Sequence, residues 1–329
     1  MHCIANHHRI RPAFTLVELL VVIVIMVILL AVAVPLLRLG LEDQEIREVT
    51  RQLNAQMALA KSMAAERGRP VGVMFQRKAG EPEQCLEIFL VEVPPPYSGD
   101  FAVSRVLVNA AGGPGGIGTS GTATFDPATC IQLSTLVRTG DRIRFNYQGP
   151  YYRITSDPSG APPSVTFVHP TAPPPQVGPA GVPFQILRQP TRSIAGALEL
   201  SGRTVIDLSM SGSGLTGLQF TPSGPADVSP VTVVFNPGGD VETVIVQDAV
   251  FVTQAPLYFL IGSNEKVGGA NLADQANRWV AVGHRTGLVT SAENKDVSIT
   301  GYVPPGPVPP AAVAEAREIA SRGQAMGGR

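Results

Sequence analysis

The sequence has little charge and few residues of the kinds that carry out chemistry. Of 329 residues, 16% are charged, the formal net charge is -1, and there are five histidines and three cysteines. This balance provides no excess of basic residues to attract nucleic acid, so no nucleic-acid partner is indicated. Three cysteines are too few for a scaffold held together by disulfides, and the chain is long enough to bury a sizeable core without them.

Motifs of several common enzyme classes are also missing. The chain has no phosphate loop ending in Gly-Lys-Ser/Thr, no His-Glu-x-x-His zinc helix and no Gly-x-Ser-x-Gly nucleophile elbow. His169 and His284 lie far apart in the sequence, and Asp240, Glu242 and Asp248 lack the spacing of an EF-hand calcium loop. We therefore expect no enzyme activity, no cofactor, no metal site and no small-molecule substrate.

The feature that is present is one long apolar run from Phe14 to Leu37, interrupted by Thr15, Glu18 and Pro35. As a helix, these 24 residues would reach roughly 36 Å, which is enough to cross the hydrocarbon of a bilayer with some tilt. A short polar leader with two arginines precedes the run. Basic residues before a membrane span favour the cytoplasmic side, so we expect a single span in the inner membrane with the following domain in the periplasm.

Glu18 is out of place in such a run. A carboxylate in hydrocarbon costs about 2.5 to 3.5 kcal/mol and usually marks a functional position. A secretory signal cut after Ala31-Val32-Ala33 is an alternative, although its apolar part is usually about 7 to 15 residues long and has no glutamate. A plain uncleaved anchor, in which Glu18 has no special role, is the other alternative.

The segment Ala13-Phe14-Thr15-Leu16-Val17-Glu18, followed by an apolar run with Pro35 near its end, resembles the processing site of type IV prepilins and type II secretion pseudopilins. The resemblance implies that prepilin peptidase removes residues 1–13 by cutting between Ala13 and Phe14, and that the new Phe14 amine is N-methylated. It also implies that Pro35 loosens the helix. The sequence departs from the family pattern at Ala13, where the usual residue is glycine.

Cleavage would place a positive charge near Glu18. The new positive amine on Phe14 would lie about one helical turn from the Glu18 carboxylate, in the same chain or in a neighbour. The resemblance implies that this pair registers each subunit as it joins other pilin-like subunits in a filament. Phe14 and Glu18 are the residues to which we assign this assembly role.

The helical pattern continues through residues 38–68 as an amphipathic stripe. Its apolar positions recur every three or four residues, as expected for a helix that packs one face on a domain; they are Ile46, Val49, Leu53, Met57, Ala60 and Ala64. Gly68 can adopt the left-handed backbone that ends a helix, and Pro70 cannot extend one. We therefore predict one helix from about Phe14 to Arg67 whose apolar stripe buries against a sheet.

Beyond residue 68, short apolar or alternating runs separated by glycine and proline predict strands. The candidates are Val71–Gln76, Leu86–Val93, Arg142–Tyr147, Tyr151–Thr155, Thr204–Leu208, Val231–Phe235, Val241–Val246, Tyr258–Ile261, Arg278–Val282 and Leu288–Ser291. The predicted fold class is α+β, in which the long N-terminal helix packs on a mainly antiparallel head at 69–302. The later strands are expected to form a meander, because turn sequences at 236–240 and 285–287 join neighbours.

Two regions of the chain interrupt this pattern. Residues 94–190 are rich in proline and glycine and are predicted to be a β-rich insertion with exposed loops. Residues 303–329 are predicted to be a stiff Pro-rich spacer and a flexible tail, with a short detached helix or a partner-docking peptide as alternatives. A helix followed directly by strands also resembles the organisation of H-type minor pseudopilins.

Cys85 and Cys130 remain after removal of the leader, which contains Cys3. Outside the cytoplasm they could form a disulfide, or they could stay buried as free thiols. Trp279, the single tryptophan, is expected to be a core anchor.

The functional interpretation is a structural subunit of a type II secretion pseudopilus, processed by prepilin peptidase. A minor type IV pilin, concerned with adhesion or DNA uptake, is the nearest alternative. A binding module or enzyme outside the cytoplasm that uses the helix as an anchor is the alternative of a different class.

Overall fold

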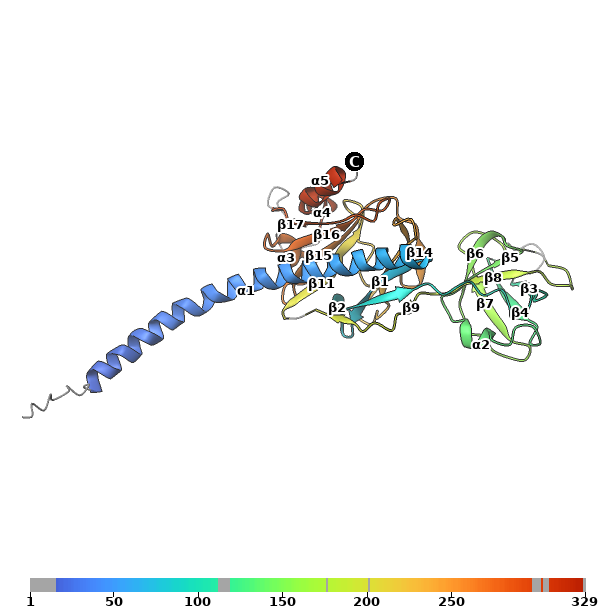
Figure 1. Ribbon diagram of the computed structural model, residues 1–329, viewed down its shortest axis with the longest axis horizontal. Coiled ribbons are helices and arrows are strands. Elements are labelled where there is room, and N and C mark those ends of the chain that lie inside the picture. The colour runs from blue at the N-terminus through green and yellow to red at the C-terminus, as the bar shows by residue number, and fades with distance from the viewer. Residues whose placement is uncertain are drawn as a thin grey trace, which may run out of the picture.

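The computed structural model describes residues 16–111, 119–175, 177–200, 202–297, 303 and 308–327, with the backbone alone at residues 32–41. Its first element is the helix α1, Leu16–Arg67, whose 52 residues make a curved rod about 78 Å long. The first half of α1 projects from the rest of the molecule, and the second half lies along the β-rich head (Figure 1). Gly68 has φ +63° and ends the helix, as predicted.

The apolar stripe of α1 is buried as predicted. Leu53, Met57, Ala60 and Ala64 have no exposed surface, and Ile46 is 5% exposed. These side chains share one hydrophobic core with residues of the β-sheet in the head. The apolar face of the helix is therefore the face that packs on the sheet, and the polar face is left to solvent. Burial of such a stripe supplies most of the stability of a helix on a domain.

The head contains one large sheet in which every strand pairing is antiparallel. The strand order is β14-β13-β12-β1-β2-β11-β15-β16-β17, and β9 and β10 also pair with β2. The bounds are β1 Val71–Lys78, β2 Glu81–Glu92, β9 Thr191–Arg192, β10 Leu198–Glu199, β11 Thr204–Ser213, β12 Val231–Phe235, β13 Val241–Val246, β14 Ala249–Phe251, β15 Leu257–Ser263, β16 Arg278–Val282 and β17 Val289–Glu293, with a short helix α3 at Gly269–Ala273.

This order makes the predicted meander wrong. The strands β12 to β14 form one meander and β15 to β17 form another, including the two predicted hairpins. However, the β1–β2 hairpin and β11 lie between them. The strands β12 and β15 carry apolar residues on both faces and are buried along almost their whole length. Such strands lie inside a sheet, with a paired strand on each side and packed side chains over each face.

Residues 97–189 fold as a separate small unit, the distal barrel. It contains β3 Val106–Ala111, β4 Ser120–Phe125, β5 Arg142–Phe145, β6 Gln148–Ile154, β7 Ser164–Val168, β8 Phe184–Leu187 and the one-turn helix α2 Leu133–Leu136. Its strands run in the order β3-β4-β7-β6-β5-β8. Val106 and Val182 exchange backbone N–H···O bonds of 2.9 and 3.0 Å, which joins β3 to the residues just before β8 and closes the sheet.

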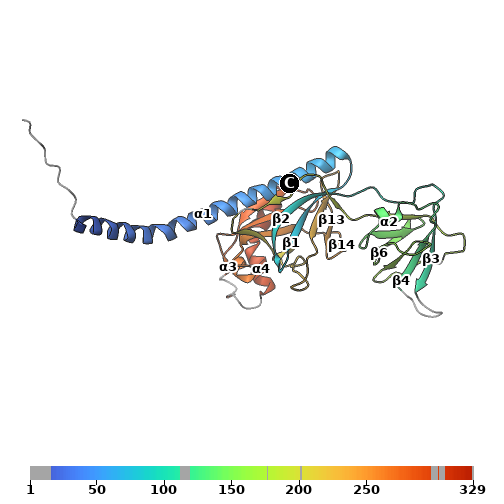
Figure 2. The same cartoon turned by 90° about the horizontal axis from the view of Figure 1, so that it is seen from below.

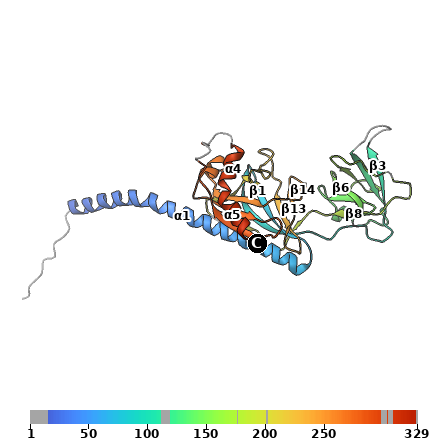
Figure 3. The same cartoon turned by 90° about the horizontal axis from the view of Figure 1, so that it is seen from above.

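The distal barrel has a hydrophobic core of its own, with six aromatic side chains in ring contact: Tyr97, Phe125, Phe145, Tyr152, Phe167 and Phe184. All three views place it at the end of the head opposite the projecting half of α1 (Figures 1, 2 and 3). Most of residues 94–190, which we predicted to be a β-rich insertion with exposed loops, therefore form a packed unit. This unit is joined to the head through residues 93–96 and 187–190. The glycine-rich residues 112–118 lie outside the described residues.

The prediction of a flexible C-terminal tail is wrong. Residues Pro310–Ala316 form α4 and Glu318–Gly327 form α5, and both pack on the head. Ala312, Val313 and Ala316 share a core with Tyr258 and Trp279, on the sheet face opposite α1. The head is therefore a sheet covered by helices on both faces. Trp279 is fully buried, as predicted, and its Nε1–H donates to Asn294 Oδ1 at 2.8 Å.

The two remaining cysteines do not form a disulfide. Both thiols are free and buried. Cys85 belongs to the core under α1, whereas Cys130 belongs to the core of the distal barrel, so the two side chains are held in different units. Burial raises the pKa of the Cys85 thiol to about 12 and also raises the pKa of Cys130, which keeps both in the unreactive thiol form.

Candidate assembly helix

The most unusual surface of the molecule is the projecting half of α1. Every large apolar side chain from Leu16 to Leu30 exposes between 47% and 79% of its surface. Apolar residues surround the whole helix here, in contrast to the stripe on residues 46–64. A helix that is apolar all round is normally buried in lipid or among other helices. The exposed rod is therefore a surface that requires an apolar environment or partners.

The predicted site residues fall on this rod or just before it. Glu18 is exposed and lies in the first turn of α1, near the end of the rod farthest from the head. A carboxylate at this position is favoured by the positive end of the helix dipole. The predicted cleavage and methylation residues, Ala13 and Phe14, lie outside the described residues. The helix continues through Pro35, in the stretch described by its backbone alone.

A membrane span is not evident from the described residues themselves: none of their helices contains an apolar stretch long enough to cross a bilayer.

The histidines and the candidate calcium carboxylates do not come together as a site. His169 Nδ1 accepts hydrogen bonds from the backbone N–H groups of Thr171 and Ala172 at 3.1 and 2.8 Å, which stabilises a turn. His284 lies beside the β16–β17 turn, where burial and Arg285 lower its pKa. Within the described residues there is no group of three His, Cys, Asp or Glu side chains that could hold a metal ion.

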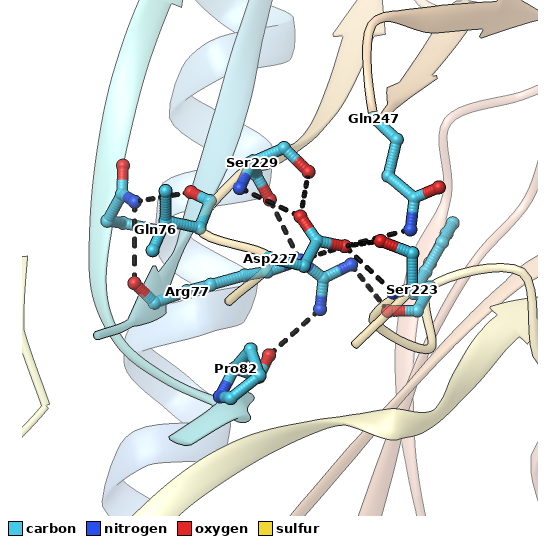
Figure 4. Close-up of polar contacts among 9 residues, drawn as sticks. Gln76, Arg77, Pro82, Ser223, Asp227, Ser229 and Gln247 are labelled. Carbon is cyan, nitrogen blue, oxygen red and sulfur yellow. Dashed lines mark hydrogen bonds and ion pairs between the residues drawn. The ribbon is translucent and has the colours of Figure 1, made fainter. Parts of the chain in front are cut away.

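A buried polar cluster in the head was not found from the sequence (Figure 4). Arg77 and Asp227 are 0% and 5% exposed and form an ion pair of 3.9 Å. Arg77 donates to the carbonyl oxygens of Ser229, Pro82 and Phe220 at 2.8 to 2.9 Å. An arginine inside an alternating strand looks like a solvated residue, so no signal in the sequence marked Arg77 as buried.

The cluster is structural. Asp227 accepts hydrogen bonds from Ser223, Ser229 and Gln247, so its carboxylate is fully bonded inside the protein. Together with Arg77, these bonds hold the pKa of Asp227 far below its usual range. The arrangement fixes the long connection between β11 and β12 to the edge of the β1–β2 hairpin.

Comparison with known proteins identifies the N-terminal segment. Residues 10–34 match the prokaryotic N-terminal methylation motif. No curated protein matches the chain, and no solved structure matches it. The chain therefore carries a prepilin segment of the type IV pilin and pseudopilin kind, and the predicted resemblance is confirmed for this segment. The H-type organisation stays a prediction.

The motif has direct consequences for the exposed rod. A prepilin segment implies processing by prepilin peptidase and assembly with other pilin subunits. The match covers the apolar run that α1 exposes, including Glu18 and ending just before Pro35. The motif therefore supports a type IV pilin-like subunit that is processed by prepilin peptidase.

Proposed function

We propose that this chain is a structural subunit of a type II secretion pseudopilus and that it has no enzyme activity. The observation that carries the proposal is the exposed apolar half of α1, which is continuous with the half that packs on the head. Before assembly, this half would anchor the protein in the inner membrane with the N-terminus in the cytoplasm and the head in the periplasm. On assembly, it would pack among the helices of other pilin-like subunits.

The pseudopilus is favoured over a type IV pilus by the organisation of the head. The helix leads directly into the β1–β2 hairpin, which occupies the middle of the large sheet. This sequence of elements resembles that of the H-type minor pseudopilins. The distal barrel is not required to seat α1, because α1 packs on the strands of the large sheet.

Glu18 would guide each subunit into place. Cleavage before Phe14 creates a positive amine, and an ion pair between this amine and Glu18 offsets part of the cost of placing a carboxylate in hydrocarbon. In a low-dielectric helix bundle, such a pair also favours one register of neighbouring helices over others. The pair thereby converts a costly charge into a docking contact.

Replacing Glu18 with alanine tests this proposal. We expect Glu18→Ala to reach the membrane at normal levels, since the substitution makes the apolar run more apolar, but to enter sheared or overproduced pseudopili at least about tenfold less, equivalent to about 1.4 kcal/mol. The amounts in membranes and in filaments are measured by immunoblotting in the native host.

Glu48→Ala is the matched control, because Glu48 is an exposed glutamate on the head half of the same helix, 3.7 Å from Arg51. This variant should assemble normally. Normal assembly of Glu18→Ala would contradict the role of Glu18, and incorporation of the wild-type chain into type IV pili alone would contradict the choice of pseudopilus.

A further inference from the structure

A cleft of about 370 Å³ lies where the head meets the distal barrel. Its floor is the face of β12 to β14 opposite α1, formed by Val234, Thr243, Ile245 and Val250. Two connections between the units make its walls, Pro94–Pro96 and Leu187–Pro190. The volume is in the range of sites that bind small molecules or a few residues of a peptide.

Apolar side chains dominate the floor and walls of this cleft. Prolines and aliphatic residues offer few hydrogen bonds, so an occupant must supply apolar groups of its own. Prolines also fix the backbone of the wall, which reduces the entropy lost when a ligand is bound. The cleft is therefore a preorganised apolar slot between two folded units.

An arginine from the distal barrel reaches into this slot. Arg142 lines the cleft, and within the described residues its guanidinium has neither a hydrogen bond nor an ion pair to a protein acceptor. Partial burial lowers the pKa of Arg142, which reflects the cost of desolvating its charge. Glu242 also lines the cleft and its charge attracts that of Arg142, but the two side chains form no ion pair within 4 Å, so the hydrogen-bond donors of Arg142 stay available. Arg142 is a donor fork suited to a carboxylate.

A second guanidinium group lies near Arg142. Arg144 lies two residues along β5, and both guanidinium groups stack on the Tyr151 ring, at 5.5 and 5.0 Å from its centroid. In the part of the chain that is described, Arg144 Nε is buried and has no hydrogen-bond partner. Two guanidinium groups on one ring concentrate positive charge there, so an anionic group beside them would be stabilised.

The strand β14 is the third part of the candidate binding site, after the apolar slot and the arginines. It ends the large sheet, and in the described part of the chain no strand pairs with its outer edge. In all views β14 lies on the side of the head that faces the distal barrel (Figures 1, 2 and 3). The edge of a sheet offers unpaired N–H and C=O groups to which an extended peptide can add as a further strand.

We propose that this cleft binds an extended segment of a partner protein that carries an acidic residue among aliphatic ones. The carboxylate of the segment pairs with Arg142, its aliphatic side chains enter the slot, and its backbone pairs with the edge of β14. A glycan fits less well, because the walls are apolar and both guanidinium groups occupy the ring of Tyr151 as a stacking surface. The site is independent of α1, so it goes beyond the proposed assembly role.

Peptide selection on the full-length chain in detergent micelles tests the proposal. A phage-displayed library of linear heptapeptides is the probe, with empty micelles as counter-selection. We expect enrichment of peptides in which Asp or Glu neighbours Val, Ile or Leu. The strongest peptide should bind Arg142→Gln at least about tenfold more weakly, because a charge-assisted bidentate contact is lost. Replacing its acidic residue with the amide should have a similar effect.

Two further variants distinguish binding in the cleft from nonspecific attraction to the positive charge of the protein. Arg105→Gln removes an exposed arginine elsewhere on the distal barrel, where its Nη1 donates to Gly181 O at 3.3 Å, and should bind the peptide normally. Val250→Trp keeps every charge but fills the slot, and should weaken binding like Arg142→Gln. Thermal unfolding confirms that each variant is folded.

Several outcomes would overturn the proposal. They are no enrichment over empty micelles, enriched peptides that lack acidic residues, and peptides that bind Arg142→Gln as well as the wild-type chain. Heparin is included as a second probe. If heparin binds through Arg142 and no peptide does, the surface recognises polyanions and the peptide proposal is wrong. None of these results depends on processing or assembly, so the proposed function is tested separately.

Discussion

Replacing Arg317 with alanine is expected to lower the free energy of unfolding by about 4 kcal/mol. Arg317 has no exposed surface and donates to the carbonyl oxygens of Gly214, Gly217 and Met210 at 2.6 to 2.9 Å. Its guanidinium carbon also lies 4.9 Å from the ring centroid of Trp279. Removal would leave three carbonyls without these donors and a cavity against an aromatic ring.

Trp279 provides the measurement. As the single tryptophan, it lies under the C-terminal helices, so its fluorescence during urea unfolding reports on their docking. The matched control is Arg322→Ala on α5, the helix that follows Arg317, where Arg322 is exposed and pairs with Glu318; it should change stability by less than about 0.5 kcal/mol. An Arg317→Ala midpoint equal to that of the control would contradict the anchoring role of Arg317.

The second large effect is expected at Asp227. Asp227→Asn should cost about 3 kcal/mol, because Arg77 loses its buried counter-charge and the new amide group meets donors instead of acceptors. Arg77 itself stays bonded to three carbonyls, which limits the loss. Urea unfolding at neutral pH, followed by Trp279 fluorescence, measures the difference.

The same carboxylate predicts a pH dependence. Its pKa in the folded protein lies below the value of about 3.9 in the unfolded chain, so its stabilisation is fully present above about pH 5 and is lost as pH falls further. The stability difference between wild type and Asp227→Asn should therefore shrink between about pH 5 and pH 2. The control is Asp126→Asn, an exposed turn residue that accepts a hydrogen bond from the N–H of Ala128 at 3.0 Å. A difference that is independent of pH would contradict this account.

Local periodicity made much of the fold predictable. The stripe on α1 from Ile46 to Ala64, the helix end at Gly68 and the two hairpins of the head all depend on residues close together in the sequence. Each strand candidate overlaps an observed strand. The order of the strands in the large sheet was not predictable, because it depends on pairings such as Val73 with Val233 across the chain.

The errors have physical causes as well. The C-terminal tail has few large apolar residues and follows a Pro-rich spacer, so it resembles a detached segment. It docks because Arg317 donates to carbonyls and contacts rings that come from distant strands, while Ala312, Val313 and Ala316 are buried. The strands β3, β4, β7 and β8 were missed because they are short and alternate with proline and glycine, whereas their stability comes from closure of the distal barrel.

The two candidate sites, the prepilin segment and the cleft, also differ in how far they could be predicted from the sequence. The apolar run and Glu18 are continuous in sequence, and the prepilin segment was therefore recognisable before the fold was known. The cleft combines Arg142, Val250 and Pro94–Pro96, which lie in separate elements of two units. No spacing of residues could have predicted that combination.

The most direct test of the assembly account is the mass of the N-terminal peptide of the protein purified from its native envelope. The account predicts that the chain begins at an N-methylated Phe14, with residues 1–13 removed. A chain that still begins at Met1, or one that begins just after Ala33, would contradict it.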